Sequence, residues 1–345
     1  MRIGIIAPPW IAVPPPTYGG TETVLDSLAT ALQDAGHDVV LYTTGDAHCP
    51  VPRGWHWPTG VEPIGSILPE VAHVLHGYEA MADRDVIHDH TLIGPMLAAN
   101  VANARVVTTV HGAFTPDLRA LYRAVSRGVA VVAISHDQRA SAPDVPVAAV
   151  IHHGLRVSDY DVGSGAGGYL LFLGRMTPDK GVHLAAEVAR RAGVPLRIAA
   201  KMHEEPERRY FDERVRPLLG TAVEYVGEVD PVQRHTLLGD AIALVNPIRW
   251  AEPFGLVMIE SLLCGTPVLA RPVGAAPEIV EDGVTGFLRA DADHLVDAVE
   301  HLGDLDRATC RARAASRFSA TRMAEDHLAL YSRVVEHGSA GMGVA

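Results

Sequence analysis

The sequence predicts an α/β protein built from two Rossmann-like, doubly wound parallel-sheet domains. Its 345 residues exceed what one hydrophobic core usually fills. Short β-branched runs alternate with amphipathic stretches from the start, as in RIGIIA, TVLDSLATALQDAG and HDVVLYTT. A passage rich in glycine and serine, RVSDYDVGSGAGG, interrupts this alternation near the middle, as an exposed domain boundary does.

These patterns predict a first domain over residues 1–157 and a second over residues 168–316. The first series continues through DVIHDH, the helix-like GPMLAANVANA, VVTTVHG, a helix around 117–126, VAVVAIS and PVAAVIHHG. The second runs from YLLFLGR through GVHLAAEVARRAG, PLRIAAK, AVEYVGEV and AIALVNP to the helix near DHLVDAVEHLG. A last helix is expected within 317–337, followed by a loose tail, SAGMGVA.

Composition narrows the class of protein. Hydrophobic residues at 48% and charged residues at 20% are ordinary for a globular chain. A net charge of −12 and the lack of a basic cluster argue against nucleic acid or an anionic membrane as partner. We expect a cytoplasmic protein without a transmembrane segment, because no apolar run is long enough and MRIGIIAPPW reads as a first strand. Cys49, Cys264 and Cys310 are expected to be structural thiols.

A pair of glycines follows the first strand, in PPPTYGGTE, where a helix is about to begin. Ligands of doubly wound sheets bind at the carboxyl ends of strands, and a helix N-terminus offers free N–H groups to an anion. Gly19 and Gly20 are therefore candidates for contact with a diphosphate, with a plain turn as the alternative. The segment lacks the GxGxxG pattern of dinucleotide folds, which argues against a nicotinamide-dependent oxidoreductase.

Two cations share the loop LGRMTPDKG, which follows the first strand of the second domain. Arg175 and Lys180 stand five positions apart there, next to a glycine. Such cations would stabilise the negative charge that develops on a departing diphosphate. A solvated surface loop is the alternative for this pattern taken alone.

Two glutamates lie in AEPFGLVMIESLLCGTPVLA, Glu252 before a helix start and Glu260 eight positions later within the helix. Gly255 leaves backbone amides of the first turn open to an oxyanion, and carboxylates suit the paired hydroxyls of sugars. Taken alone, the glutamates could equally be a favourable charge on the helix dipole and a solvated face.

Histidines end two of the expected strands. His111, in TTVHG, reads from the residues alone as a hydrogen-bonded core histidine. His90, in VIHDH, is a second residue that could line a cleft. Strand alternation argues against His88-Asp89-His90 as metal ligands, and His152-His153 are likewise no convincing pair, so no metal is expected.

Taken together, these segments resemble the family-4 retaining glycosyltransferases of the GT-B fold. EPFGLVMIE resembles the glutamate-seven-glutamate pattern of that family, and CGTPV and GAAPEIVEDGVTGFL follow it. The likeness extends through YGGTE, VIHDH, VHG, LGRMTPDKG and VGEVD. The stretch AAKMHEEPERRYFDERVRPLL resembles the subgroup that includes the avilamycin-pathway enzyme.

The resemblance implies a role for each candidate. Gly19 and Gly20 would lie near the donor diphosphate, with Arg175 and Lys180 neutralising it from the other domain across a cleft. Glu260 would hold the ribose hydroxyls, and His111 would face the reactive side of the transferred sugar. That sugar would be held by Glu252 together with the backbone of Pro253, Phe254, Gly255 and Leu256. The final helix would cross back onto the first domain.

The expected reaction is transfer of a sugar from a nucleotide diphosphate donor with retention of configuration and without a metal or other cofactor. Uridine is favoured as donor base and guanosine is second; a natural product, a glycan or a lipid-linked sugar would accept. Trp55 and Trp57, in a loop of the first domain, could stack on a sugar or anchor the loop. The alternatives are a sugar-nucleotide epimerase, a retaining disaccharide phosphorylase, and a non-catalytic sugar-nucleotide-binding protein.

Overall fold

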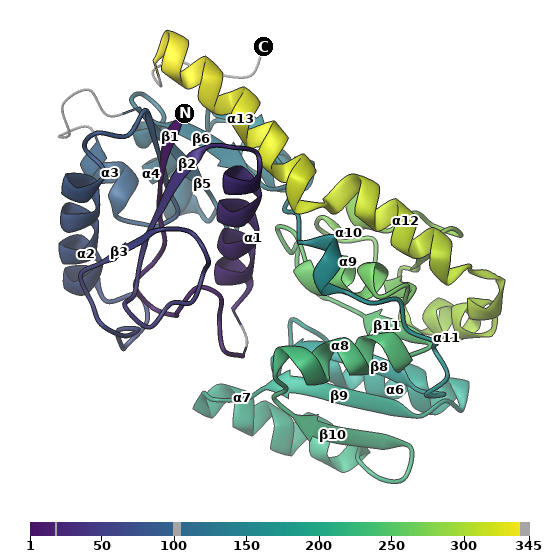
Figure 1. The fold of residues 1–345 in the computed structure, drawn as a ribbon. Coiled ribbons are helices and arrows are strands. Elements are labelled where there is room, and N and C mark those ends of the chain that lie inside the picture. The colour runs from purple at the N-terminus through teal and green to yellow at the C-terminus, as the bar shows by residue number, and fades with distance from the viewer. Residues whose placement is uncertain (18, 99–104, 339–345) are drawn as a thin grey trace. The chain divides into compact units, whose positions relative to one another are not determined.

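A computed structural model, which describes residues 1–17, 19–98 and 105–338, folds the chain into two compact units (Figure 1). Unit one comprises Met1–Arg156 and the chain from Ser319 onward, and unit two comprises Val157–Phe318. Each contains one parallel sheet flanked by helices, which confirms the predicted fold class. The glycine-rich passage belongs to unit two, because the amides of Gly163, Gly165 and Gly167 bond the carbonyls of Cys264, Gly239 and Asp240.

Unit one contains a seven-stranded sheet of order β3-β2-β1-β4-β5-β6-β7 in the described residues. Its strands are β1 Arg2–Ile6, β2 Asp38–Thr43, β3 Arg53–Trp55, β4 Val86–Asp89, β5 Val106–Thr109, β6 Ala130–Ala133 and β7 Val147–Val150. Its helices are α1 Gly20–Asp34, α2 Ile67–Ala80, α3 Gly94–Leu97, α4 Pro116–Val125, α5 His136–Ala140 and α13 Ala320–His337.

Unit two contains a six-stranded sheet of order β10-β9-β8-β11-β12-β13 in the described residues. Its strands are β8 Leu170–Arg175, β9 Leu196–Lys201, β10 Val223–Gly227, β11 Ala243–Asn246, β12 Val268–Ala270 and β13 Gly286–Leu288. Its α-helices are α6 Val182–Ala192, α7 Glu205–Tyr210, α8 Pro231–Asp240, α9 Leu256–Leu263, α10 Ala276–Ile279, α11 Ala292–Glu300 and α12 Arg307–Phe318. Shorter turns of helix are η2 Val157–Asp159, the π-helical η3 Phe211–Val215, η4 Arg216–Leu218 and η5 Leu302–Asp304.

Two segments for which the sequence makes a prediction lie partly or wholly outside the described residues. The helix-like stretch 94–104 begins as α3, which ends at Leu97, and residues 99–104 lie outside the described residues. The tail 339–345 lies outside them as well.

The central strands are buried along their whole length because helices cover both faces of each sheet. In β8, Leu170 to Gly174 are buried and only Arg175 is exposed. In unit two, β8 and β9 pack with α6 and α11 in one core that includes Phe172, Ile198 and Leu295. The apolar runs read as strands in the sequence are therefore the interior layer of each unit.

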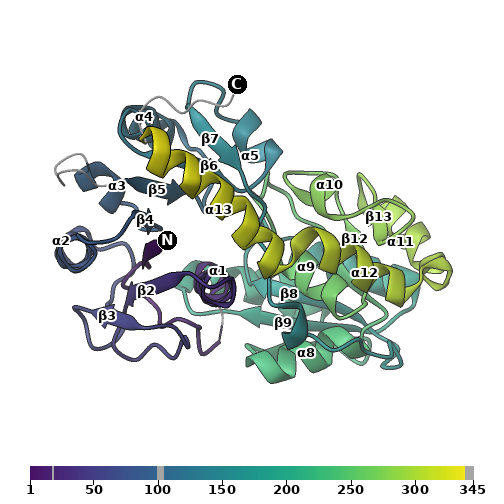
Figure 2. The same cartoon turned by 45° about the horizontal axis from the view of Figure 1, so that its top comes forward.

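Local signals set several helix starts. Asp230 caps α8 by accepting from the amide of Gln233 at 2.8 Å, while the Gln233 side chain accepts from the Asp230 amide at 3.2 Å. Ser319 caps α13 by accepting from the Arg322 amide at 3.2 Å. α13 then packs on α1, β4 and β5 of unit one (Figure 2), with Met323, Tyr331 and Val334 buried.

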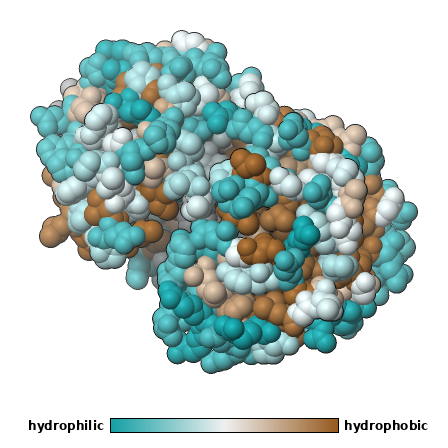
Figure 3. Space-filling view, turned by 60° about the horizontal axis from the view of Figure 1, so that its bottom comes forward, coloured by the Kyte–Doolittle hydropathy of each residue, from teal (hydrophilic) through white to brown (hydrophobic). Residues whose placement is uncertain are grey.

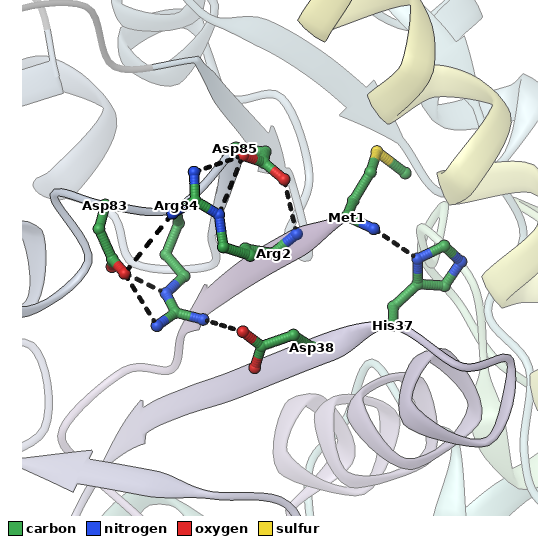
Figure 4. Close-up of polar contacts among 7 residues, drawn as sticks. All are labelled: Met1, Arg2, His37, Asp38, Asp83, Arg84 and Asp85. Carbon is green, nitrogen blue, oxygen red and sulfur yellow. Dashed lines mark hydrogen bonds and ion pairs between the residues drawn. The ribbon is translucent and has the colours of Figure 1, made fainter.

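The amino ends of β1, β2 and β4 are joined by charged side chains (Figure 4). Arg2 donates to Asp85 from its amide at 2.7 Å and from Nη2 at 2.8 Å, and Arg84 donates to Asp38 at 2.9 Å. This network lies at the edge opposite the carboxyl ends, so it contributes to the sheet and not to a ligand site.

The surface in Figure 3 is largely hydrophilic with smaller apolar patches between, as is ordinary for a folded protein. None of the helices in the described residues is both long and apolar enough to span a bilayer. Cys49, Cys264 and Cys310 are unpaired and buried, and burial raises the pKa of each, to about 12 for Cys49.

Candidate active site

In unit two, the predicted cations lie at the carboxyl edge of the sheet. Arg175 is the last residue of β8 and pairs in register with Lys201 at the end of β9. The Arg175 side chain is exposed, whereas Lys180, in the loop that leads to α6, is only 14% exposed. Lys201 is a third cation at this edge. The run PLRIAAK predicts its place at the end of a strand, but no motif marks it as a site residue.

Lys180 and Glu252 are in direct contact through Nζ and Oε1. Both side chains are about 85% buried, and the Lys180 ammonium also lies 5.9 Å from the centre of the Trp250 ring. The second carboxylate oxygen of Glu252, Oε2, is buried without a hydrogen-bond partner in the described residues. A buried carboxylate oxygen without a donor is costly, so it is a ready acceptor for a ligand hydroxyl.

The loop after Glu252 leads into α9. Pro253 and Phe254 are buried, Gly255 is the N-cap and Leu256 begins the helix. Gly255 has φ of 99°, a left-handed conformation that favours glycine, and it places no side chain over the first-turn amides. Those amides can therefore face an anionic or hydroxyl-bearing ligand.

The backbone of Gly274 and Ala275 packs against the backbone of Glu252. The amide of Ala275 donates to the Glu252 carbonyl at 3.0 Å. A Cβ on Gly274 would stand 2.4 Å from that carbonyl oxygen and 2.5 Å from the Glu252 nitrogen. Gly274 is thus a positioning residue for Glu252, signalled in the sequence only by its place in GAAPE.

Glu260 lies in the middle of α9 and is 4% exposed. Its Oε1 is 3.4 Å from the hydroxyl of Tyr160 and 3.4 Å from Nε of Arg234. Tyr160 directly follows η2, and Arg234 lies in α8. No sequence motif marks either residue as part of the site. They orient the carboxylate and balance its charge.

In unit one, Gly19 and Gly20 occupy the start of α1, as expected. Gly19 is the N-cap without a side-chain cap, and its carbonyl accepts from the Thr23 amide at 3.1 Å and hydroxyl at 2.8 Å. A Cβ on Gly19 would stand 2.6 Å from that of Pro15, so the close approach of two chain segments requires glycine there.

His90 and His111 lie together at the carboxyl ends of β4 and β5. Nδ1 of His90 is 2.9 Å from Nε2 of His111, and His111 is half-buried while His90 is buried. Burial lowers the pKa of His111 to about 4 and that of His90 well below its usual value. The pair is therefore neutral near pH 7, with one ring donating and the other accepting.

Three further histidines, His88, His153 and His327, complete what we term the histidine cluster. The ring of His88 lies 3.9 Å from that of His90, and His153 stacks at 5.2 Å on His111. His88 bonds the Tyr331 hydroxyl at 2.6 Å and the Thr109 hydroxyl at 2.8 Å. His327 and Tyr331 come from α13, so sequence distance concealed their part in the cluster.

The two tryptophans expected in one loop of unit one differ in setting, because Trp55 is the last residue of β3 and Trp57 lies in the loop after it. Trp57 donates from Nε1 to the Pro69 carbonyl at 3.2 Å, whereas the Trp55 ring is 54% exposed. Trp57 anchors the loop, and Trp55 is the one of the pair that has an open face for a ligand.

The structure thus places the predicted residues in two sets. Unit two holds Arg175 at the end of β8, Lys180 in the loop that follows, Glu252 and Gly255 before α9, and Glu260 within α9. Unit one holds Gly19, Gly20, His90 and His111 at strand ends or a helix start. Cations beside amides and carboxylates suit a ligand that carries both phosphate and sugar hydroxyls.

Comparison with known proteins shows which family of proteins the chain resembles. Residues 18–159 match the model described as Glycosyltransferase Family 4, and residues 167–304 match Glycosyl transferases group 1. The phosphatidyl-myo-inositol mannosyltransferase of Mycolicibacterium smegmatis is 29% identical, with 92% of this chain and 88% of that protein covered. AviGT4, a glycosyltransferase involved in avilamycin A biosynthesis, is 26% identical with a TM-score of 0.75, covering 97% of this chain and 98% of that one. HepE of Anabaena, solved with UDP and glucose, has a TM-score of 0.76 at 20% identity, covering 96% and 99%.

The fold and the two matched domains define a glycosyltransferase of the GT-B type. The chain belongs to the family-4 group of these enzymes.

Proposed function

We propose that this glycosyltransferase transfers a sugar from a nucleotide diphosphate sugar to its acceptor with retention of configuration and without a bound metal. The observation that carries the proposal is the Lys180–Glu252 pair beside the open N-terminus of α9, where Glu252 Oε2 has no hydrogen-bond partner among the described residues. Lys180 offers a cation for the diphosphate, and Glu252 offers an acceptor for a sugar hydroxyl. The two residues lie in two loops that are in direct contact.

Each site residue has its own role in the proposed reaction. Arg175 and Lys180 stabilise the charge that grows on the departing diphosphate, and the resemblance to the family assigns the amides of Gly19 and Gly20 to the same diphosphate. Glu260, oriented by Tyr160 and Arg234, holds the ribose hydroxyls. Glu252 and the backbone from Pro253 to Leu256 hold the transferred sugar, with His111 on its reactive side. Catalysis rests on orientation and electrostatic stabilisation.

Retention requires either an enzyme nucleophile or attack from the face that the leaving group occupies. Glu252 already contacts Lys180 and serves as a sugar-hydroxyl ligand in this proposal. We therefore assign the proton of the acceptor to a phosphate oxygen of the donor, in a same-face displacement.

The donor is proposed to be a uridine diphosphate sugar, with guanosine second. HepE, which shares the fold, was solved with UDP and glucose, which supports uridine. The acceptor remains of the classes expected from the sequence, a natural product, a glycan or a lipid-linked sugar; the name of the mycolicibacterial relative, a phosphatidyl-myo-inositol mannosyltransferase, adds weight to the last.

The test combines binding with product analysis. Thermal shifts are measured with UDP, GDP, ADP, TDP and their sugar conjugates, with and without EDTA, and slow donor hydrolysis is followed by NMR. Stabilisation by one nucleotide, unaffected by EDTA, with release of the retained anomer supports the proposal. Release of an epimerised sugar would instead identify a sugar-nucleotide epimerase, and phosphate-dependent turnover would identify a disaccharide phosphorylase. Binding without turnover would identify a non-catalytic sugar-nucleotide-binding protein.

A further inference from the structure

A hollow of about 400 Å³ on unit two collects arginines that the proposed reaction does not use. Arg214 comes from η3, Arg249 from the loop after β11, and Arg271 from the residue after β12. Its remaining lining consists of His183, Leu184, Pro247, Ala290, Asp291, Ala292 and Leu295. Segments distant in sequence thus bring three guanidinium groups to one small space.

These arginines have no carboxylate partner in the described residues. Arg214 and Arg249 are exposed and take part in no ion pair there. Arg271 donates there only to the carbonyls of Ala290 at 2.9 Å and Ile248 at 3.4 Å. The single carboxylate of the lining, Asp291, is already bonded to the amide and ring of His294, at 3.0 and 2.8 Å. Three neighbouring cations without counter-ions repel one another, in a chain whose net charge is −12.

The arginines affect the protonation of His183, which also lines the hollow. Burial lowers the pKa of His183, and the charges of Arg214 and Arg249 lower it further, whereas the carboxylate of Glu187 raises it. Nδ1 of His183 is 2.6 Å from the Tyr210 hydroxyl, which fixes the ring at the start of α6. An anion in the hollow would relieve the repulsion among the arginines and raise the pKa of this histidine.

The residues that line the hollow also indicate that the anion has an organic part. Leu184, Pro247 and Leu295 add apolar side chains to a lining that also contains the three arginines. A volume of about 400 Å³ exceeds that of a phosphate ion and is in the range of small-molecule sites. Guanidinium forks match phosphate oxygens in pairs, which a compact ammonium cannot do.

We propose that this hollow is a separate binding site for a phosphomonoester with a small organic body, held by Arg214, Arg249 and Arg271. The site is distinct from Lys180 and Glu252, although the Arg249 amide bonds the carbonyl of Asp179, next to Lys180, at 2.7 Å. The inference does not depend on the proposed transferase activity.

The experiment uses the full chain in chloride buffer of matched ionic strength, titrated by calorimetry with inorganic phosphate, glucose 6-phosphate and UDP. Wild type is compared with Arg214→Gln/Arg249→Gln, which removes two side chains without protein partners, and with Arg127→Gln, an exposed arginine of unit one, as the charge control. We expect glucose 6-phosphate to bind more tightly than inorganic phosphate, the double variant to bind it at least about tenfold more weakly, and the control to match wild type.

The ring signals of His183 provide a second readout, because glucose 6-phosphate should raise its pKa in wild type and not in the double variant. Equal binding of glucose 6-phosphate by wild type and the double variant would overturn the proposal. Competition between UDP and glucose 6-phosphate, with parallel loss of UDP binding in the double variant, would also overturn it, since the hollow would then be part of the donor site. Unchanged UDP binding in a variant that has lost glucose 6-phosphate supports two separate sites.

Discussion

Nδ1 of His90 lies 2.9 Å from Nε2 of His111, and this contact joins the ends of β4 and β5 in a cluster of five histidines. Burial keeps all five neutral near pH 7 by lowering their pKa values. The tautomer of His111 is coupled to that of His90, since one ring must donate where the other accepts. The cluster therefore bears on the stability of unit one and on the role proposed for His111.

Stability should fall with acid because of this cluster. Burial lowers the pKa of His327 from 6.5 to about 4, so the unfolded chain takes up a proton between these values that the folded chain does not. The free energy of unfolding then decreases as pH falls from about 6.5 to 4, by about 3 kcal/mol for such a histidine. Urea unfolding at several pH values should show a shallower pH dependence for His327→Gln than for wild type. Identical slopes would show that His327 does not titrate on unfolding.

His111→Ala should lower kcat by about 10² or more if His111 faces the reacting sugar, with little loss of melting temperature because the ring is half-buried. Donor hydrolysis and thermal unfolding are measured on the same preparation. His153→Ala is the comparison, since its ring stacks on His111 but is buried. A large loss of stability in His111→Ala with unchanged kcat in the folded fraction would identify a core histidine.

The Lys180–Glu252 contact predicts strong coupling between two residues that are 72 positions apart. Lys180→Ala should cost roughly 2 to 4 kcal/mol of transition-state stabilisation through the loss of a cation at the diphosphate. It should also reduce stability, because Glu252 is left buried without its partner. A double-mutant cycle with Glu252→Gln should give a coupling of about 1 to 3 kcal/mol in unfolding. Additive effects would mean that the pair does not form in solution.

Much of this site follows from sequence pattern. The apolar runs predict the strands, and strand ends in a parallel sheet meet at one edge, which places Arg175 and Lys180 in one loop at that edge. The resemblance to the family, and not this geometry, predicts Glu252 in the same site. Glu260 eight residues after Glu252 is predicted within α9, where it lies. The positions of these residues on strand ends and in a helix depend on local period and on the geometry of parallel sheets.

The pairing of side chains does not follow from pattern. The contact of Lys180 with Glu252, and those of Tyr160 and Arg234 with Glu260, depend on loops whose course is determined by packing. His327 joins the cluster only because α13 packs on unit one, and a helical period shows an apolar face without showing what it covers. Such contacts need the three-dimensional fold.

Glu260→Gln should raise the donor KM more than it lowers kcat, because the residue is proposed to hold the ribose and not the reacting centre. Arg234→Met should do the same to a smaller degree, since it acts through the Glu260 carboxylate at 3.4 Å. Steady-state kinetics with the donor found in the screen test both. A fall in kcat at unchanged KM would assign Glu260 to the chemical step.

Gly274→Ala should disrupt the site through the backbone of Glu252, and Gly283→Ala is its matched control. Both glycines have positive φ, 61° and 74°, so alanine strains the backbone at each, at a cost of about 1 kcal/mol. A Cβ at Gly283 would meet nothing within 4 Å, whereas one at Gly274 would stand 2.4 Å from the Glu252 carbonyl oxygen. The loop must move in the first variant alone, so donor binding and turnover should fall in Gly274→Ala and stay near wild type in Gly283→Ala. If the two variants lose stability equally and both keep full activity, Gly274 does not position Glu252, and the Glu252 loop tolerates displacement without loss of function.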